Sequence, residues 1–158
     1  MPQASEPLFF RGATAINLDN KGRFALPIKY RQEISASCQN QLVITIDTQA
    51  RCLLIYPLPQ WRFIQEQLQS LPSFEPQTRR LQRLIIGHAS DVEVDKAGRV
   101  LLAATLREYA QLDKKMMLVG QGNKLELWDE THWLDIRQQY LLQSENAALP
   151  EQLLQISL

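Results

Sequence analysis

The chain has 158 residues, 45% of them hydrophobic and 22% charged, and its formal net charge is zero. This composition is typical of a globular protein and excludes overall disorder. Its apolar runs are far shorter than the roughly 20 residues that cross a bilayer, and no basic segment followed by an apolar stretch opens the chain. We therefore expect a cytoplasmic protein with no membrane partner.

The first half of the chain predicts short strands, tight turns and two helices. Asp19 and Gly22 favour a turn, because Asp accepts hydrogen bonds from the following amides and Gly tolerates positive φ. We expect the strands on either side of this turn to pair as a hairpin, and Pro27 suits the first position of a helix. The expected elements are strands at 14–18, 23–26, 42–47 and 52–56 and helices at 28–34 and 61–71.

The second half repeats this plan after a connecting helix at 75–87, with Pro76 in its first turn and Gly87 at its end. The remaining residues, 144–158, show no clear period. The expected elements are strands around Val92 and at 100–102, 115–119 and 124–128, and helices at 104–112 and 133–141.

An internal repeat is the main feature of the sequence. Ile16 to Leu26 aligns with Val92 to Leu102 at an offset of 76, and Leu53 to Tyr56 aligns with Leu125 to Trp128 at an offset of 72. A unit of about 50 residues is marginal alone, because it removes too little surface from water. We therefore expect the two copies to interleave and share one core. The matched positions are Asp19 with Asp95, Gly22 with Gly98, Arg23 with Arg99, and Arg31 with Arg107.

Charge is distributed unevenly between the two copies. Residues 1–83 contain ten Lys and Arg against six Asp and Glu, whereas residues 84–158 contain seven against eleven. The segment from Arg11 to Arg31 holds five basic residues and, up to its end, only Asp19 as an acid. A polyanion responds to the local patch and not to the total charge, so a net charge of zero does not exclude nucleic acid.

The cysteines and histidines do not predict a metal site. Cys38 and Cys52 lie 14 positions apart, and His88 and His132 complete no ligand pattern around them. A zinc site needs more ligands at tighter spacing. We expect reduced, packed thiols, no metal and no cofactor.

Asp19 and Asp95 allow two interpretations. Two carboxylates brought together by the repeat could act as an acid and base pair. However, each stands at the first position of a tight turn, where it bonds to the following amides, and the sequence shows no nucleophile with an adjacent base and no phosphate loop. We expect Asp19, Gly22, Asp95 and Gly98 to form turns, and we do not expect an enzyme.

Arg23 and Arg99 follow the turn glycines and also allow two interpretations. Each could form an ion pair with the Asp of a turn, but exposed pairs contribute only about 0–1 kcal/mol. Alternatively, the turns present these arginines to DNA bases, with Lys21 and Lys96 beside them at the phosphates. The second turn is the weaker candidate because the acids around it oppose a polyanion; these acids are Asp91, Glu93 and Asp95.

Three further basic residues extend the candidate DNA surface: Arg11, Lys29 and Arg31. Each could equally be a solvated side chain. Arg31 also matches Arg107 in the second copy, which is consistent with a structural pair on the two short helices.

Four groups of residues, in order along the chain, resemble the MraZ family. The resemblance runs from Phe10 to about Trp133 and is specific because several motifs occur together. The motifs are Phe10-Arg-Gly-Ala-Thr-Ala-Ile-Asn-Leu-Asp-Asn-Lys-Gly-Arg23, Leu54-Ile-Tyr-Pro-Leu-Pro-Gln-Trp61, Arg79-Arg-Leu-Gln-Arg-Leu84 with Gly87-His-Ala89, and Gly120 with Glu126-Leu-Trp-Asp129.

The resemblance implies an α+β fold, a double-split β-barrel of the SpoVT-AbrB type made from two tandem repeats. It also implies a ring-shaped homo-oligomer, associated with the nucleoid, that binds direct repeats in double-stranded promoter DNA and represses its own division and cell-wall gene cluster. A scaffold that binds protein partners is the alternative. The expected division is an extension at 1–9, repeats at 10–61 and 88–133, connecting helices at 62–87, and a C-terminal helix and tail at 134–158.

Overall fold

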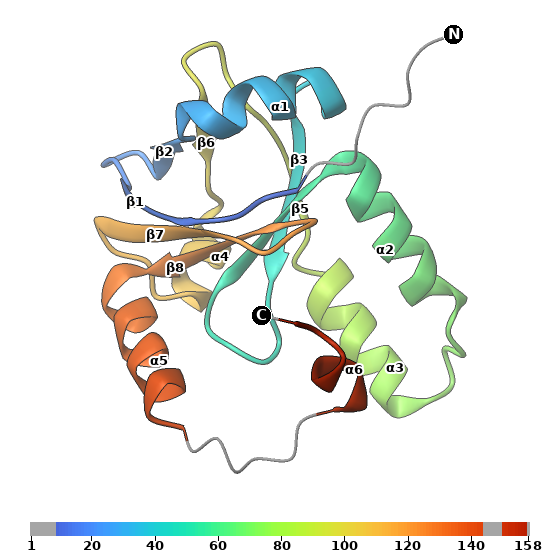
Figure 1. Ribbon diagram of the computed structural model, residues 1–158. Coiled ribbons are helices and arrows are strands. Elements are labelled where there is room, and N and C mark those ends of the chain that lie inside the picture. The colour runs from blue at the N-terminus through green and yellow to red at the C-terminus, as the bar shows by residue number, and fades with distance from the viewer. Residues whose placement is uncertain (1–8, 144–149, 158) are drawn as a thin grey trace, which may run out of the picture.

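The computed structural model describes residues 9–143 and 150–157 and shows strands and short helices alternating along the chain (Figure 1). The expected extension at 1–9 lies, apart from Phe9, outside these residues. The elements are β1 (Ala13–Asn17), β2 (Arg23–Ala25), α1 (Ile28–Cys38), β3 (Gln41–Ile46), β4 (Leu53–Pro57), α2 (Leu58–Ser70), α3 (Pro76–Leu81), the π-helix η1 (Gln82–Ile86), β5 (Ser90–Glu93), β6 (Arg99–Leu101), α4 (Ala104–Tyr109), β7 (Lys115–Gly120), β8 (Leu125–Asp129), α5 (Glu130–Leu142) and α6 (Glu151–Leu154).

The strands form a six-stranded sheet in the order β1-β7-β8-β4-β3-β5 and a separate ribbon of β2 with β6. Every paired strand is antiparallel to its neighbour. The two repeats exchange strands, because β1 of the first pairs with β7 of the second and β5 of the second pairs with β3 of the first. This exchange confirms the expected interleaving and is consistent with a double-split barrel.

The expected hairpin around Asp19 is wrong in one respect. The turn itself closes, since the Asp19 N–H donates to the Arg23 carbonyl at 2.8 Å and the Gly22 N–H donates to the Asp19 carbonyl at 3.1 Å. Beyond the turn, however, β1 pairs with β7 and β2 pairs with β6. The strands separate because each finds its partner in the other repeat.

One face of the six-stranded sheet packs against α1, α4 and the ribbon in a shared core. Alternate residues of the central strands enter this core, including Leu42, Ile44, Leu53 and Leu127. The opposite face is covered in two halves. The helix α2 and η1 pack on β3 and β4, and α5 packs on β7 and β8 (Figure 1).

A pseudo-two-fold axis passes through both sheets at positions that correspond between the repeats. In the large sheet Leu54 of β4 lies opposite Glu126 of β8, and these residues match at the repeat offset of 72. In the ribbon Phe24 lies opposite Val100, which match at the offset of 76. The symmetry therefore places the turn that precedes β2 and the turn that precedes β6 at equivalent positions in the fold.

Several helix ends differ from the sequence-based expectation. The helix α1 continues to Cys38, beyond the expected end at 34, and stops where Gln39 and Asn40 adopt positive φ. The connecting helix ends as the π-helix η1, and there the hydroxyl of buried Thr45 donates to the Ile85 carbonyl at 2.6 Å. Across the described residues, every helix is too short or too polar to span a membrane.

Candidate functional site

The turn from Asp19 to Arg23 is held by the carboxylate of its first residue. The backbone N–H groups of Lys21 and Arg23 donate to Asp19 Oδ1 at 2.8 and 2.9 Å, and Arg23 Nε donates to Asp19 Oδ2 at 3.2 Å. The N–H of Arg23 is the main reason that the pKa of the Asp19 carboxyl lies below its ordinary value. The charged carboxylate therefore fixes both the turn and its arginine.

The turn from Asp95 to Arg99 has the same geometry. The N–H groups of Ala97 and Arg99 donate to Asp95 Oδ1 at 2.9 and 2.8 Å, and Arg99 Nε donates to Oδ2 at 3.2 Å. The pKa of the Asp95 carboxyl is again lowered, chiefly by the N–H of Arg99. Both turns thus contain the ion pair that was one of the two alternatives, and contact of these arginines with DNA stays a prediction.

Both arginines lie on one face of the β2–β6 ribbon. Arg23 is opposite Leu101 and Arg99 is opposite Ala25. Directly opposite residues share a face, as do residues two apart on a strand, so these four side chains point the same way. The other face is closed, because Phe24 and Val100 are buried. The ribbon therefore presents two arginines together from one outer face.

The strands before the two turns differ in charge. Ala15 and Asn17 are exposed on β1, whereas Asp91 and Glu93 are exposed at the matching positions of β5. A polyanion that reaches Arg99 therefore approaches two carboxylates that have no counterpart beside Arg23. We call the turns Asp19–Arg23 and Asp95–Arg99 the two tips. Their hydrogen bonds have the same geometry, but their electrostatic surroundings differ.

The other predicted basic residues lie in different places relative to the two tips. Lys21 and Lys96 are exposed within the turns themselves. Arg11 precedes β1, so it lies at the end of that strand opposite to the first turn, where its guanidinium is 5.8 Å from the centre of the Phe9 ring. Lys29 is exposed at the start of α1, with Nζ 4.8 Å from the centre of the Tyr30 ring.

Arg31 and Arg107 are half-buried behind the turns, not at their tips. Arg31 lies against Gly98 and donates from Nε to the Leu26 carbonyl at 2.7 Å. Arg107 lies against Gly22. Each arginine therefore contacts the turn of the other repeat, a relationship that sequence spacing alone cannot show.

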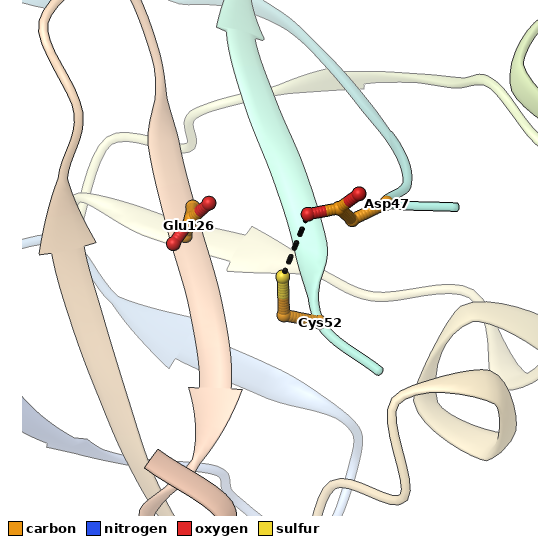
Figure 2. Close-up of side chains that lie close together, drawn as sticks. All are labelled: Asp47, Cys52 and Glu126. Atoms are coloured by element: carbon orange, nitrogen blue, oxygen red, sulfur yellow. Dashed lines mark hydrogen bonds between the residues drawn. The ribbon is translucent and has the colours of Figure 1, made fainter. Parts of the chain in front are cut away.

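A second cluster of polar groups lies on the helix-covered face of the large sheet (Figure 2). Ligand-type atoms of Asp47, Cys52 and Glu126 all lie within 4.8 Å of one another. The Cys52 thiol donates to Asp47 Oδ2 at 3.6 Å, and Trp128 Nε1 donates to Glu126 Oε1 at 3.1 Å. A closed zinc site needs four ligands, and this cluster offers three. We interpret Cys52 and Asp47 as a hydrogen-bonded pair, with Glu126 beside them and hydrogen-bonded to Trp128.

Burial dominates the acidity of this cluster. It raises the pKa of Glu126, with the nearby Asp47 adding to the effect, and it raises the pKa of the Cys52 thiol. Burial therefore disfavours the thiolate, which is the nucleophilic form of Cys52. Sequence reasoning missed the cluster because its members come from three strands or strand ends. The one signal was Glu126 at the position where the first repeat has Leu54.

Comparison with known proteins agrees with the repeat. The family model described as "MraZ protein, putative antitoxin-like" matches residues 9–84 and again residues 85–155. The chain belongs to the MraZ family.

Relatives from several bacteria match most of the chain, and each carries the name "Transcriptional regulator MraZ". One from Pseudoalteromonas atlantica is 55% identical over 151 residues, which cover 94% of this chain and 99% of that protein. One from Psychromonas ingrahamii is 59% identical over 78% of this chain and 81% of its own length. One from Yersinia pestis is 55% identical over 78% of this chain and 82% of its own length.

Proposed function

We propose that this protein is a sequence-specific DNA-binding transcriptional regulator that reads double-stranded DNA through Arg23 and Arg99. The carrying observation is the position of both arginines on one exposed face of the β2–β6 ribbon. Arg suits bidentate contact with guanine, which offers two acceptors in the major groove. The regulator names of the relatives support the same class of function.

The ribbon has the right form for this role. The major groove of B-DNA admits a two-stranded β-ribbon. Diagonal neighbours on paired strands lie about 7–8 Å apart, and stacked bases repeat every 3.4 Å or so, so Arg23 and Arg99 span about two base steps. Lys21 and Lys96 flank them and suit phosphates, while Arg11 and Lys29 extend the basic surface.

Assembly supplies the affinity that one ribbon lacks. We propose a ring-shaped homo-oligomer whose ribbons engage directly repeated DNA boxes, as the family resemblance implies. Linked sites act at high effective concentration, and rotation around a ring repeats the tips in one direction. Exposed apolar side chains on α5 support self-association, since a large apolar patch marks an interaction surface; they are Leu134, Tyr140, Leu141 and Leu142.

The proposed target is the promoter of the protein's own division and cell-wall gene cluster, which it would repress as a cytoplasmic, nucleoid-associated protein. These finer statements rest on the family resemblance, as does the division into repeats at 10–61 and 88–133. The two equivalent turns, at Asp19 and Asp95, support the division into two repeats.

An electrophoretic shift with the duplex upstream of the protein's own coding sequence tests the proposal. We expect discrete shifted bands that a scrambled duplex does not compete away, and a steep loss of affinity as salt is added. Binding that is insensitive to salt and equal for both duplexes would contradict it and favour the alternative, a scaffold for protein partners.

A further inference from the structure

Two arginines outside the tips each contact the turn of the opposite repeat. A Cβ added to Gly98 would lie 2.3 Å from Nε of Arg31, and one added to Gly22 would lie 3.0 Å from Cζ of Arg107. Both glycines are buried, although the residues on either side of them are not. Each guanidinium therefore occupies the space that a side chain on the turn would need.

Backbone hydrogen bonds join the same partners. The Leu26 N–H donates to the Gly98 carbonyl at 2.8 Å, and the Leu102 N–H donates to the Gly22 carbonyl at 2.8 Å. Leu26 and Leu102 immediately follow the ribbon strands and lead into α1 and α4. Each turn glycine is thus contacted from two sides by the other repeat, through a backbone hydrogen bond and through an arginine side chain. We call this pair of contacts the grip on the glycine.

The two grips are not identical. Arg31 Nε donates to the Leu26 carbonyl at 2.7 Å. Arg107 occupies the matching position, yet its buried Nε has no hydrogen-bond partner among the described residues. Arg107 is consequently held against the first turn by packing, and we expect that turn to open more readily than the second.

We propose that Arg107 and Arg31 are positioning residues that act across the repeats: Arg107 sets the Arg23 tip and Arg31 sets the Arg99 tip. The proposal rests on the proposed function. The sequence suggested that Arg31 belongs to the basic DNA-binding surface, whereas the structure assigns it to positioning the second tip. The positioning depends on the flat guanidinium group, which lies against a glycine because that residue has no Cβ. A lysine ammonium is a compact point charge and does not reproduce this contact.

The cross-repeat assignment makes a specific prediction about pairs of substitutions. Arg107→Ala should weaken binding to the upstream duplex roughly tenfold, within the roughly 5- to 150-fold that a bidentate arginine–guanine contact contributes. It should add little to Arg23→Ala, because both act on one contact, and it should add fully to Arg99→Ala. Arg31→Ala should show the reverse pattern.

Lysine variants separate positioning from direct phosphate contact. If Arg107 touched a phosphate, Lys would retain much of the affinity, and Ala would reduce the slope of log affinity against log salt by about one. A positioning role predicts that Arg107→Lys binds as weakly as Arg107→Ala and that both keep the wild-type slope. Retained affinity in Arg107→Lys, or coupling of Arg107 to Arg99 and not to Arg23, would overturn the proposal.

Hydrogen exchange followed by mass spectrometry tests the grip without DNA, on the full protein in its native assembly. We expect Arg107→Lys to speed exchange in the peptide covering residues 18–24 and to leave 94–100 unchanged, with Arg31→Lys giving the opposite result. Unchanged exchange in both peptides would refute the grip even where binding falls. If exchange changes as expected but Arg23→Ala binds DNA normally, the grip stands and the proposed function fails.

Discussion

Arg23 and Arg99 lie diagonally across the β2–β6 ribbon, one following each glycine turn, and both side chains share its exposed face. They come from positions 76 residues apart in the chain. Strand exchange between the repeats brings them together, because β2 pairs with β6 and not with β1. The ribbon therefore forms one combined surface from two copies of the same short motif.

Neutralising the acids beside the second tip should strengthen DNA binding. Asp91→Asn together with Glu93→Gln removes two exposed carboxylates from β5, and we expect tighter binding to any duplex, most clearly at low salt. Fluorescence anisotropy over a salt series would measure it. Asp135→Asn together with Glu66→Gln, exposed on α5 and α2, is the control that removes the same two charges elsewhere. Equal effects of control and test variants would show that only total charge matters.

Alanine at the turn glycines should destabilise the protein. Gly22 and Gly98 have φ of +81° and +77°, and an L-residue in this region costs about 1–2 kcal/mol. Gly98→Ala should cost more than Gly22→Ala, since its Cβ meets Arg31, whose Nε is hydrogen-bonded to Leu26. Thermal unfolding measures both. Asn tolerates positive φ, so Gly22→Asn should be milder than Gly22→Ala; equal losses would make the contact with Arg107 the deciding factor.

The tips should lose their order in acid. The folded-state pKa values of Asp19 and Asp95 are lowered, so their contribution is present above the unfolded pKa and is lost as pH falls through the folded value. Hydrogen exchange of the turn peptides, corrected for intrinsic pH dependence, should show opening only at acidic pH. Asp19→Asn keeps an acceptor for the Lys21 and Arg23 amides, so it should hold the first turn at all pH values. Opening of that turn in the variant at low pH would assign the transition to another group.

Replacing Glu126 by Gln should raise stability at neutral pH. Burial raises the folded-state pKa of Glu126, so its contribution is greatest below the unfolded pKa and is lost as pH rises through the folded value. Glu126→Gln should therefore unfold at a higher temperature than wild type at pH 8, and the difference should shrink at pH 4. Glu108→Gln, on the exposed side of α4, is the control. A gain that is constant with pH would exclude ionisation of Glu126 as its cause.

Much of the architecture could be predicted from local patterns, and the pairing could not. The Asp19 turn and the connecting helix at Pro76 can be recognised from neighbouring residues, and the repeat can be recognised by aligning the chain with itself. The partner of β1 is not, because alternation of apolar and polar residues marks a strand without naming its neighbour. The cross-repeat contact of Arg107 with Gly22 depends on that pairing, which is why the matched arginines suggested only an unspecified structural pair.

The central claim is that Arg23 reads DNA from an intact assembly. The most direct measurement compares wild type with Arg23→Ala for binding to the upstream duplex, alongside the mass of each assembly in solution. We expect unchanged mass and loss of specific binding in the variant, with only weak, salt-sensitive association remaining. An Arg23→Ala protein that assembles normally and still binds the duplex with wild-type affinity would contradict it.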